Sequence, residues 1–207
     1  MVKSVKFLDL HKQYLSIKDE IDNAISSTIE STSFVGSKTN QKFECEFAEY
    51  QQAKHCIGVG NGTDAIEISI EALDLPSNSE IIVPANSFIA TSEAVTRSGH
   101  KVIFADVEEN SYNICVADIE KQLTSKTAAI IVVHLYGNPC NMNKIVSLAK
   151  KHNLRVIEDS SQAHGAEYHG QRVGALADIG TFSFYPGKNL GAFGDAGAIL
   201  TNDDYLS

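Results

Sequence analysis

The sequence has few cysteines, no excess of basic residues and no long hydrophobic run, and each shortage excludes a class of function. Its four cysteines, Cys45, Cys56, Cys115 and Cys140, form no C-x-x-C pair, so neither a zinc site nor a redox pair is indicated, and no metal is expected. Lysine and arginine total 17 against 26 aspartates and glutamates, for a formal net charge of -9. This balance argues against nucleic-acid binding, which needs a basic face, but leaves room for a local phosphate site.

Membrane and export signals are also missing. The longest apolar run, AAIIVV from Ala128, is far too short to cross a membrane. The first residues, MVKSVKFLDLHKQYLS, contain no apolar core of a secretory signal. We therefore expect a cytoplasmic protein with no membrane partner.

The order of apolar patterns indicates the fold class. Residues 9–30 place apolar side chains at helical spacing, and a second helix is expected over about 40–50. Short apolar runs then alternate with helix-like segments. The runs are 56–60, 80–84, 101–106, 129–133, 154–159, 180–185 and 197–202, and the segments between them are 65–73, 89–98, 117–123 and 143–152. This alternation predicts a three-layer α/β/α fold with a mainly parallel, seven-stranded sheet. Only a glycine-rich loop joins the last two runs, which allows the last strand to run antiparallel.

Residues that follow the predicted strands are the site candidates, because ligands bind at the carboxyl ends of strands in open parallel sheets. After the first run, Gly62 and Thr63 open a helix and form a phosphate cup, although a plain glycine turn with a helix cap is the alternative. Phe88 follows the second run, and taken alone it fits a core position better than a ligand platform. Asp159 ends the fifth run as a cap, a metal ligand or the partner of a cationic ligand atom, and Gln162 and His164 follow it.

The stretch FSFYPGKNLGAFGDAG carries the last two candidates. Ser183 stands at the end of the sixth run, and Lys188 follows five positions later among small and aromatic residues. Lys188 could clamp a phosphate, be an ordinary loop charge, or act as a nucleophilic amine that forms a Schiff base. A P-loop is excluded, since neither Ser nor Thr follows the lysine.

Together these candidates match the needs of pyridoxal phosphate (PLP). The phosphate needs a helix N-terminus and hydroxyls, and the flat ring needs an aromatic side chain to stack on. The pyridine nitrogen needs a carboxylate that keeps it protonated, and the aldehyde needs a lysine amine.

Several stretches resemble the DegT/StrS family of PLP-dependent sugar aminotransferases, which have the aspartate aminotransferase (type I) fold. The resemblance covers nearly the whole chain in family order, through FLDLHKQY, FVGSKTNQKFECEFAEY, HCIGVGNGTDAIEISIEAL, IIVPANSFIATSEAV, VVHLYGNP, VIEDSSQAHGA and FSFYPGKNLGAFGDAGAI. It implies that Lys188 bonds covalently to the cofactor and that Asp159 pairs with the pyridine nitrogen. The remaining implied cofactor contacts are Gly62, Thr63 and Ser183 at the phosphate, Phe88 on the ring and Gln162 beside the ring hydroxyl.

The resemblance also implies a reaction and a domain organisation. Related sugar dehydratases carry histidine where this chain has Lys188, so transamination is favoured. Family members are longer and have a small C-terminal domain. We therefore expect residues 1–207 to be a PLP-binding large domain with an N-terminal helical segment (1–50), truncated before the small domain and prone to aggregation by itself. Asn138-Pro-Cys-Asn141 departs from the family's Gln-Pro-Ala-Asp, in a loop.

The expected function is transfer of the amino group of L-glutamate to a keto group of a nucleotide-linked sugar. The resemblance is greatest to enzymes that act on dTDP-3-keto-6-deoxyhexoses, and it implies a homodimer. A rival hypothesis is a catalytically incomplete fragment or a regulatory pseudoenzyme, although both Asp159 and Lys188 are retained. GVGNG suggests a second rival, a nucleotide-binding oxidoreductase, but its glycines lack the G-x-G-x-x-G spacing.

Overall fold

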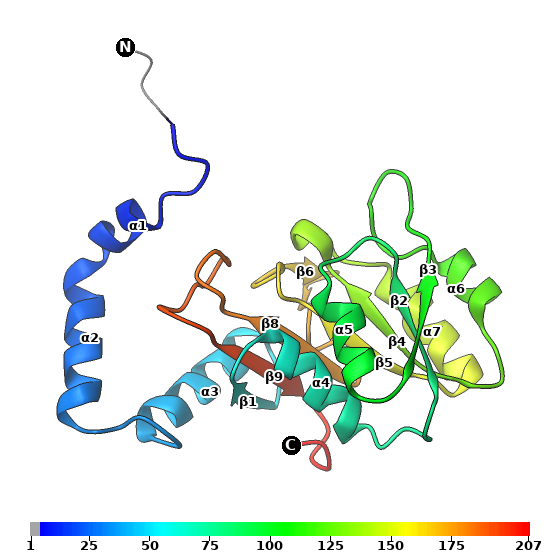
Figure 1. Cartoon of the computed structure of the whole chain (residues 1–207), viewed down its shortest axis with the longest axis horizontal. Helices are drawn as coiled ribbons and strands as arrows, with labels where there is room; N and C mark the ends of the chain where they lie inside the picture. Colours follow the sequence, from blue (N-terminus) through cyan, green and yellow to red (C-terminus); the bar gives the residue numbers. More distant parts are fainter. Residues whose placement is uncertain (1–4) are drawn as a thin grey trace.

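The computed structural model describes residues 5–207 (Figure 1). The domain predicted over 1–207, and its helical segment over 1–50, therefore include four residues, 1–4, that lie outside the described part. Among the helices of residues 5–207, none is both long enough and apolar enough to cross a bilayer.

A seven-stranded sheet forms the centre of the molecule, in the order β1-β9-β8-β5-β4-β2-β3. The five strands from β3 to β8 along this order pair in parallel, whereas β9 runs antiparallel to both of its neighbours, β8 and β1. The bounds are β1 (His55–Val59), β2 (Glu80–Pro84), β3 (Lys101–Ala105), β4 (Thr127–Val133), β5 (Arg155–Asp159), β8 (Ile179–Ser183) and β9 (Gly197–Thr201). The predicted mainly parallel sheet with an antiparallel last strand is confirmed.

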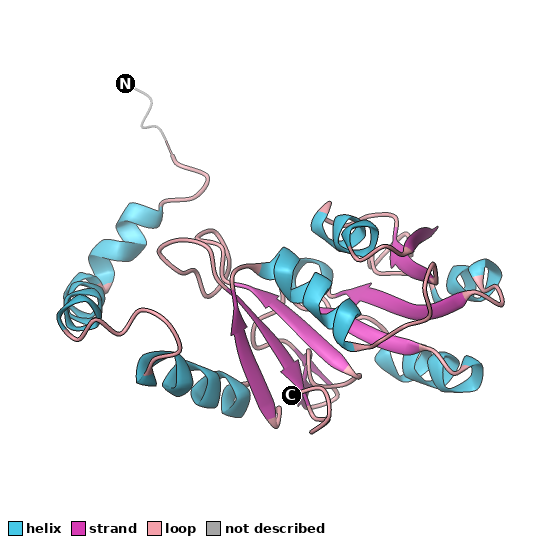
Figure 2. Cartoon of the chain, turned by 60° about the horizontal axis from the view of Figure 1, so that its bottom comes forward, coloured by secondary structure: helices cyan, strands magenta, loops and turns pink. Residues whose placement is uncertain are grey.

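Helices cover both faces of this sheet, as Figure 2 shows. Because side chains alternate along a strand, Ile81 and Val83 of β2 pack against one helical layer while Ile82 packs against the other. The first layer holds α4 (Gly62–Ala72) and α5 (Ala90–Arg97), and the second holds α6 (Val116–Gln122) and α7 (Met142–His152). The core strands are buried on both faces, which explains their nearly continuous apolar sequences.

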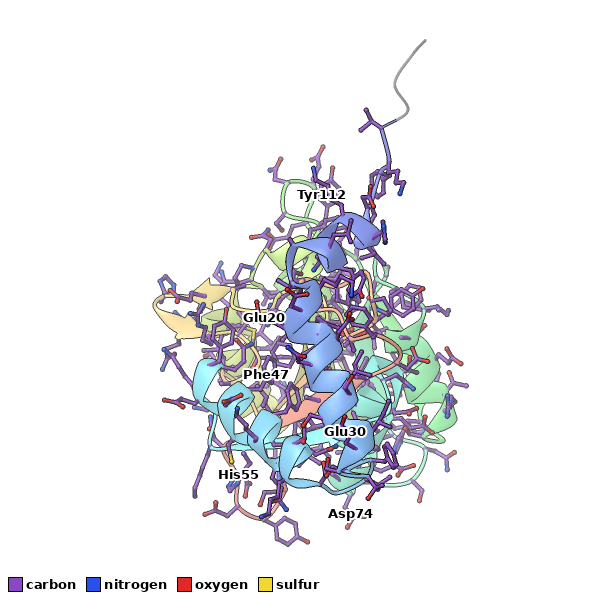
Figure 3. All side chains as sticks on the ribbon, turned by 90° about the vertical axis from the view of Figure 1, so that its left-hand side faces the viewer. Glu20, Glu30, Phe47, His55, Asp74 and Tyr112 are labelled. Atoms are coloured by element: carbon purple, nitrogen blue, oxygen red, sulfur yellow. The ribbon has the colours of Figure 1, made fainter. Side chains whose placement is uncertain are left out.

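The N-terminal helical region departs from the prediction. The helix expected over 9–30 is two helices, α1 (Leu10–Ser16) and α2 (Lys18–Glu30), because Ile17 leaves the helical conformation with φ -130° and ψ 22°. No residue of α2 is buried, and this helix stands away from the sheet (Figure 1). Figure 3 views the molecule from this side, with Glu20 and Glu30 of α2 labelled. In contrast, α3 (Lys38–Tyr50) packs Phe47 against β8 and β9.

The sequence patterns did not predict two short elements. One is the hairpin of β6 (Glu167–Tyr168) and β7 (Gln171–Arg172), and the other is a single 3-10 turn, η1 (Leu135–Gly137), directly after β4. Both are too short to produce a periodic pattern in the sequence.

Candidate functional site

A cavity of about 550 Å³ opens at the carboxyl edge of the sheet. Every candidate cofactor residue lines it, although the residues come from well separated parts of the chain. They are Gly62 and Thr63 in the first turn of α4, Phe88 between β2 and α5, Asp159 at the end of β5, Gln162 just beyond it, Ser183 at the end of β8, and Lys188 between β8 and β9. The structure brings these residues together in one cavity, while their assignment as site residues and their individual roles stay predictions.

The N-terminus of α4 forms one wall of the cavity. Asn61 caps the helix, since its side-chain oxygen accepts the Asp64 N–H at 2.9 Å and its amide donates to the Asp64 carboxylate at 2.8 Å. The backbone N–H groups of Gly62 and Thr63 have no acceptor within residues 5–207, as expected for the first turn of a helix. These two donors and the positive end of the helix dipole therefore face the space where an anion would bind.

Gly62 is at this position because α4 and β8 approach closely. A Cβ on Gly62 would lie 2.6 Å from the Cβ of Ser183, a separation that real side chains do not reach. The absence of a side chain thus brings the free N–H groups of α4 next to the Ser183 hydroxyl. Backbone donors and a hydroxyl converge there, which is the arrangement a phosphate group requires.

Asp159 lies at the floor of the cavity with 5% of its surface exposed. Thr91 Oγ1 donates to Asp159 Oδ2 at 3.0 Å, and the Ser161 N–H donates to Asp159 Oδ1 at 3.2 Å. Ser87 shares a hydrogen bond of 2.9 Å with Thr91, so the carboxylate is held in one orientation by a chain of hydroxyls. Sequence reasoning missed Thr91 and Ser87; their spacing of four residues at the start of a predicted helix was the available signal.

Lys188 is half-buried in the loop between β8 and β9. Its backbone N–H donates to the Tyr185 carbonyl at 2.8 Å. Its side-chain amine forms neither an ion pair nor a hydrogen bond with any residue in the described range 5–207. An amine at the cavity wall that is not tied to a carboxylate remains available for chemistry.

Phe88 and Gln162 complete the walls. Phe88 is 67% exposed, so the interpretation of this residue as a core side chain is wrong. Gln162 uses its side-chain oxygen to accept the Tyr136 N–H at 2.9 Å, which fixes the side chain and connects the cavity to the loop after β4. Other charged side chains also line the cavity: Asp64, Glu93, Arg97 and Asp195.

His164 lies behind the site and is not a cavity residue. Its ring packs against Phe182 and Phe184, with ring centroids at 5.3 and 5.4 Å, and neither ring nitrogen has a hydrogen-bond partner within residues 5–207. Burial lowers the pKa of His164 to about 4, and the positive charge of Lys188 acts in the same direction. His164 is therefore a neutral packing residue at pH 7.

Among residues 5–207, no group of three histidine, cysteine, aspartate or glutamate side chains is arranged to hold a metal ion. The cavity instead combines a free amine, a fixed carboxylate, an open helix N-terminus and an exposed aromatic ring. This set of donors and acceptors fits PLP, whose phosphate, ring nitrogen, ring face and aldehyde each need one of them.

The sequence profile of the DegT/DnrJ/EryC1/StrS aminotransferase family matches residues 15–207. The chain belongs to this family. The resemblance found in the sequence motifs is thereby confirmed, and the described fold agrees with it.

Three similar proteins extend the comparison. The chain is 48% identical over 203 residues to a dTDP-3-amino-3,6-dideoxy-alpha-D-galactopyranose transaminase of Aneurinibacillus thermoaerophilus, with 98% of this chain and 56% of the relative covered. It is 45% identical over 204 residues to a pleiotropic regulatory protein of Geobacillus stearothermophilus, with 99% of this chain and 55% of the relative covered. The crystal structure of NtdA from Bacillus subtilis with bound cofactor PMP superposes with a TM-score of 0.93 at 35% identity, over 100% of this chain and 47% of that one.

The chain thus spans about half the length of the curated relatives it matches. The α/β fold and the family are established over this length. The division into a large domain here and a small domain elsewhere stays a prediction.

Proposed function

We propose that this chain supplies the cofactor-binding part of a PLP-dependent aminotransferase. In this proposal the whole protein transfers the amino group of L-glutamate to a keto group of a nucleotide-linked sugar. The observation that carries it is the single cavity in which the unpaired amine of Lys188 and the fixed carboxylate of Asp159 meet the open N-terminus of α4. PLP, when bound, supplies an electron sink for the carbanion that forms next to the transferred nitrogen.

The residues of the first cavity wall would hold the phosphate. Gly62, Thr63 and Ser183 line the cavity, and the donors that they offer are the free N–H groups of Gly62 and Thr63 and the two side-chain hydroxyls. They provide neutral donors, and the helix dipole adds a positive potential, so a dianionic phosphate is stabilised without a paired cation.

Asp159 would hold a proton on the pyridine nitrogen. Its two oxygens already accept hydrogen bonds from Thr91 and Ser161, so the carboxylate does not have to reorganise when the ring arrives. Phe88 would cover the face of the ring, and the Gln162 amide would lie beside its hydroxyl side.

Lys188 would have two tasks. Its Nζ would hold the cofactor covalently until the amino-group donor binds. With substrate bound, its free amine would serve first as general base and then as general acid, taking a proton from the donor's α-carbon and returning it to the cofactor. In the second half of the reaction Lys188 returns a proton in the opposite direction to the substrate carbon that becomes aminated.

The choice of substrate rests on the relatives. The transaminase of A. thermoaerophilus is named for a dTDP-linked 3-amino-3,6-dideoxy sugar, which supports a dTDP-3-keto-6-deoxyhexose as the acceptor here. L-Glutamate as the donor, a homodimer and a cytoplasmic location complete the proposal. The name of the G. stearothermophilus relative favours a regulatory role as the second candidate, but the intact set of Asp159, Lys188 and the α4 wall supports catalysis.

The test is covalent trapping of the cofactor in the full-length protein. We expect PLP to produce a visible absorbance band, and borohydride to fix the cofactor on the peptide that contains Lys188. Lys188→Ala should lose the band and the trapped peptide, whereas Lys121→Ala, which changes an exposed lysine at the end of α6, should keep both.

An unchanged band in Lys188→Ala would overturn the assignment of the lysine. Turnover separates the two candidate functions. Formation of 2-oxoglutarate from L-glutamate that depends on a nucleotide-linked keto sugar supports the aminotransferase, and cofactor trapping without any such turnover supports the regulatory role.

A further inference from the structure

Tyr136 has a backbone conformation that its residue type disfavours. Its φ of 56° and ψ of 23° lie in the left-handed region, which an aromatic residue rarely occupies. The side chain is 80% exposed. Within residues 5–207 its hydroxyl has no hydrogen-bond partner and its ring stacks on no other ring. Packing inside the described part of the chain therefore does not explain why a tyrosine stands here.

The strained residue is attached to the cavity wall. The Tyr136 N–H donates to Gln162 Oε1 at 2.9 Å, and Gln162 lines the cavity. The next residue, Gly137, has φ 81°, and a Cβ there would be in van der Waals contact with the Gln162 carbonyl oxygen, at 3.4 Å. Tyr136 is thus fixed at the edge of the site and does not belong to a loose loop.

A buried network anchors the same turn to β5. His134 is fully buried; its backbone N–H donates to the Asp159 carbonyl at 3.1 Å, and its Nδ1 accepts the Cys140 N–H at 3.1 Å. Nε2 therefore carries the proton and donates to Glu158 Oε2 at 3.0 Å. Glu158 is also fully buried, and its carboxylate accepts three further backbone N–H groups, those of Gly174, Leu176 and Ala177.

The strain at Tyr136 is therefore maintained by its surroundings from both sides. Gln162 holds the residue itself, and the pair of His134 and Glu158 holds the start of the turn. Strained backbone that its surroundings enforce in this way is concentrated at functional sites. Two other exposed aromatic residues, Phe88 and Tyr185, line the cavity itself.

We propose that Tyr136 is a specificity-determining residue that binds the sugar of the nucleotide-linked acceptor. A pyranose ring has an apolar face of C–H groups and a rim of hydroxyls, so a rigidly presented tyrosine offers it both a stacking surface and a hydrogen-bonding hydroxyl. The inference rests on the proposed function, and it assigns recognition of the acceptor's sugar to Tyr136. The donor, a small amino acid that has no such ring, gains nothing from Tyr136.

The test uses the full-length enzyme loaded with PLP and compares the wild type with Tyr136→Asn. Asparagine tolerates the left-handed conformation, so this change removes the aromatic ring without adding strain. The reaction is followed from dTDP-3-amino-3,6-dideoxy-α-D-galactose and 2-oxoglutarate. We expect KM for the amino sugar to rise about five- to tenfold, with unchanged KM for 2-oxoglutarate and an unchanged or higher melting temperature.

Two further measurements accompany the kinetics. Calorimetric titration of the same dTDP-sugar into cofactor-free protein should show a similar loss of affinity in Tyr136→Asn. Tyr205→Asn is the matched control and should behave as the wild type. Tyr205 is 90% exposed and follows β9. Because β9 runs antiparallel to β8, its last residue lies at the edge of the sheet opposite the cavity.

The outcomes distinguish this inference from the proposed function. A wild type that turns over no dTDP-, UDP- or GDP-linked amino sugar overturns the proposed function and this inference with it. An active wild type whose KM for the sugar is unchanged in Tyr136→Asn overturns this inference alone. A lower melting temperature together with equal rises in both KM values would show a structural role, and would also overturn it.

Discussion

At the scale of single residues, the site depends on groups that are fixed before a ligand binds. Asp159 has two hydrogen-bond donors on its carboxylate, and Gln162 is held by the Tyr136 N–H. Gly62 contributes by lacking a side chain, which lets α4 approach Ser183. A cofactor that binds to such groups loses little free energy to their reorganisation.

Gly62→Ala adds only one methyl group, but it should weaken cofactor binding strongly. The new Cβ would lie 2.6 Å from the Ser183 Cβ, so either α4 or β8 must shift and the two phosphate donors separate. We expect PLP affinity, measured by fluorescence titration, to fall by at least about tenfold, which corresponds to about 1.4 kcal/mol.

Gly194→Ala is the control for this measurement, because a Cβ at Gly194 meets no atom within 4 Å. It should bind PLP as the wild type does. Equal affinities of Gly62→Ala and the wild type would show that the close approach of α4 and β8 is not needed for the cofactor.

At the scale of elements, α4 contributes both to the core and to the candidate site. Its inner face packs Ala65, Ile66 and Ile70 against the sheet, while its first turn faces the cavity. The cap that starts the helix also determines where its free N–H groups point. Asn61 provides this cap through two hydrogen bonds with Asp64.

Asn61→Ala should lower stability and cofactor affinity together. Loss of the cap at a helix N-terminus costs about 1 kcal/mol, which urea unfolding monitored by circular dichroism would detect. Asn61→Ser should restore most of the stability, because a serine hydroxyl also accepts the Asp64 N–H. If Asn61→Ala unfolds at the wild-type urea concentration, the start of α4 is held by its packing and not by this cap.

At the scale of the whole molecule, a group of aromatic rings joins the N-terminal region to the sheet. Phe47 of α3 contacts Phe182 and Phe184 around β8, and the neutral ring of His164 fills the space between them. By contrast, α2 leaves Ile25 and Ile29 exposed. Exposed apolar side chains of this kind agree with the aggregation expected for the chain by itself, which stays a prediction.

The protein should lose stability as the pH falls from about 6.5 toward 4. The pKa of His164 is lowered to about 4 in the folded state, against a usual value near 6.5, so the unfolded chain binds a proton over this range and the folded protein does not. The contribution of His164 to the free energy of unfolding should decrease by up to about 1.4 kcal/mol per pH unit.

His164→Gln removes this titration and should flatten the difference between unfolding free energies measured at pH 7 and pH 5. His169→Gln changes an exposed histidine nearby and should retain the wild-type dependence. Identical pH profiles of His164→Gln and the wild type would show that His164 does not stay neutral in the folded protein.

The sequence by itself determined the fold class and supplied the candidate site residues, whose roles stay predictions. The short apolar runs at 81–83 and 130–133 alternate with helix-like segments, a pattern typical of strands buried in a parallel sheet. The stretch FSFYPGKNLGAFGDAG places Lys188 in the loop that follows such a strand. These are local patterns, so the sequence shows them directly. The same patterns failed at Ile17, where a single residue breaks the expected helix without any proline or glycine to signal it.

Only the tertiary structure decided which distant groups meet. Thr91 reaches Asp159 across 68 residues, Gln162 holds the strained Tyr136, and His164 is buried without a hydrogen-bond partner within the described chain. These contacts depend on the strand order, which puts β5 between β8 and β4. They also depend on how closely neighbouring elements approach, as α4 and β8 do at Gly62 and Ser183. Residue periodicity carries no information on either quantity, because both arise only when the strands have paired and the helices have packed.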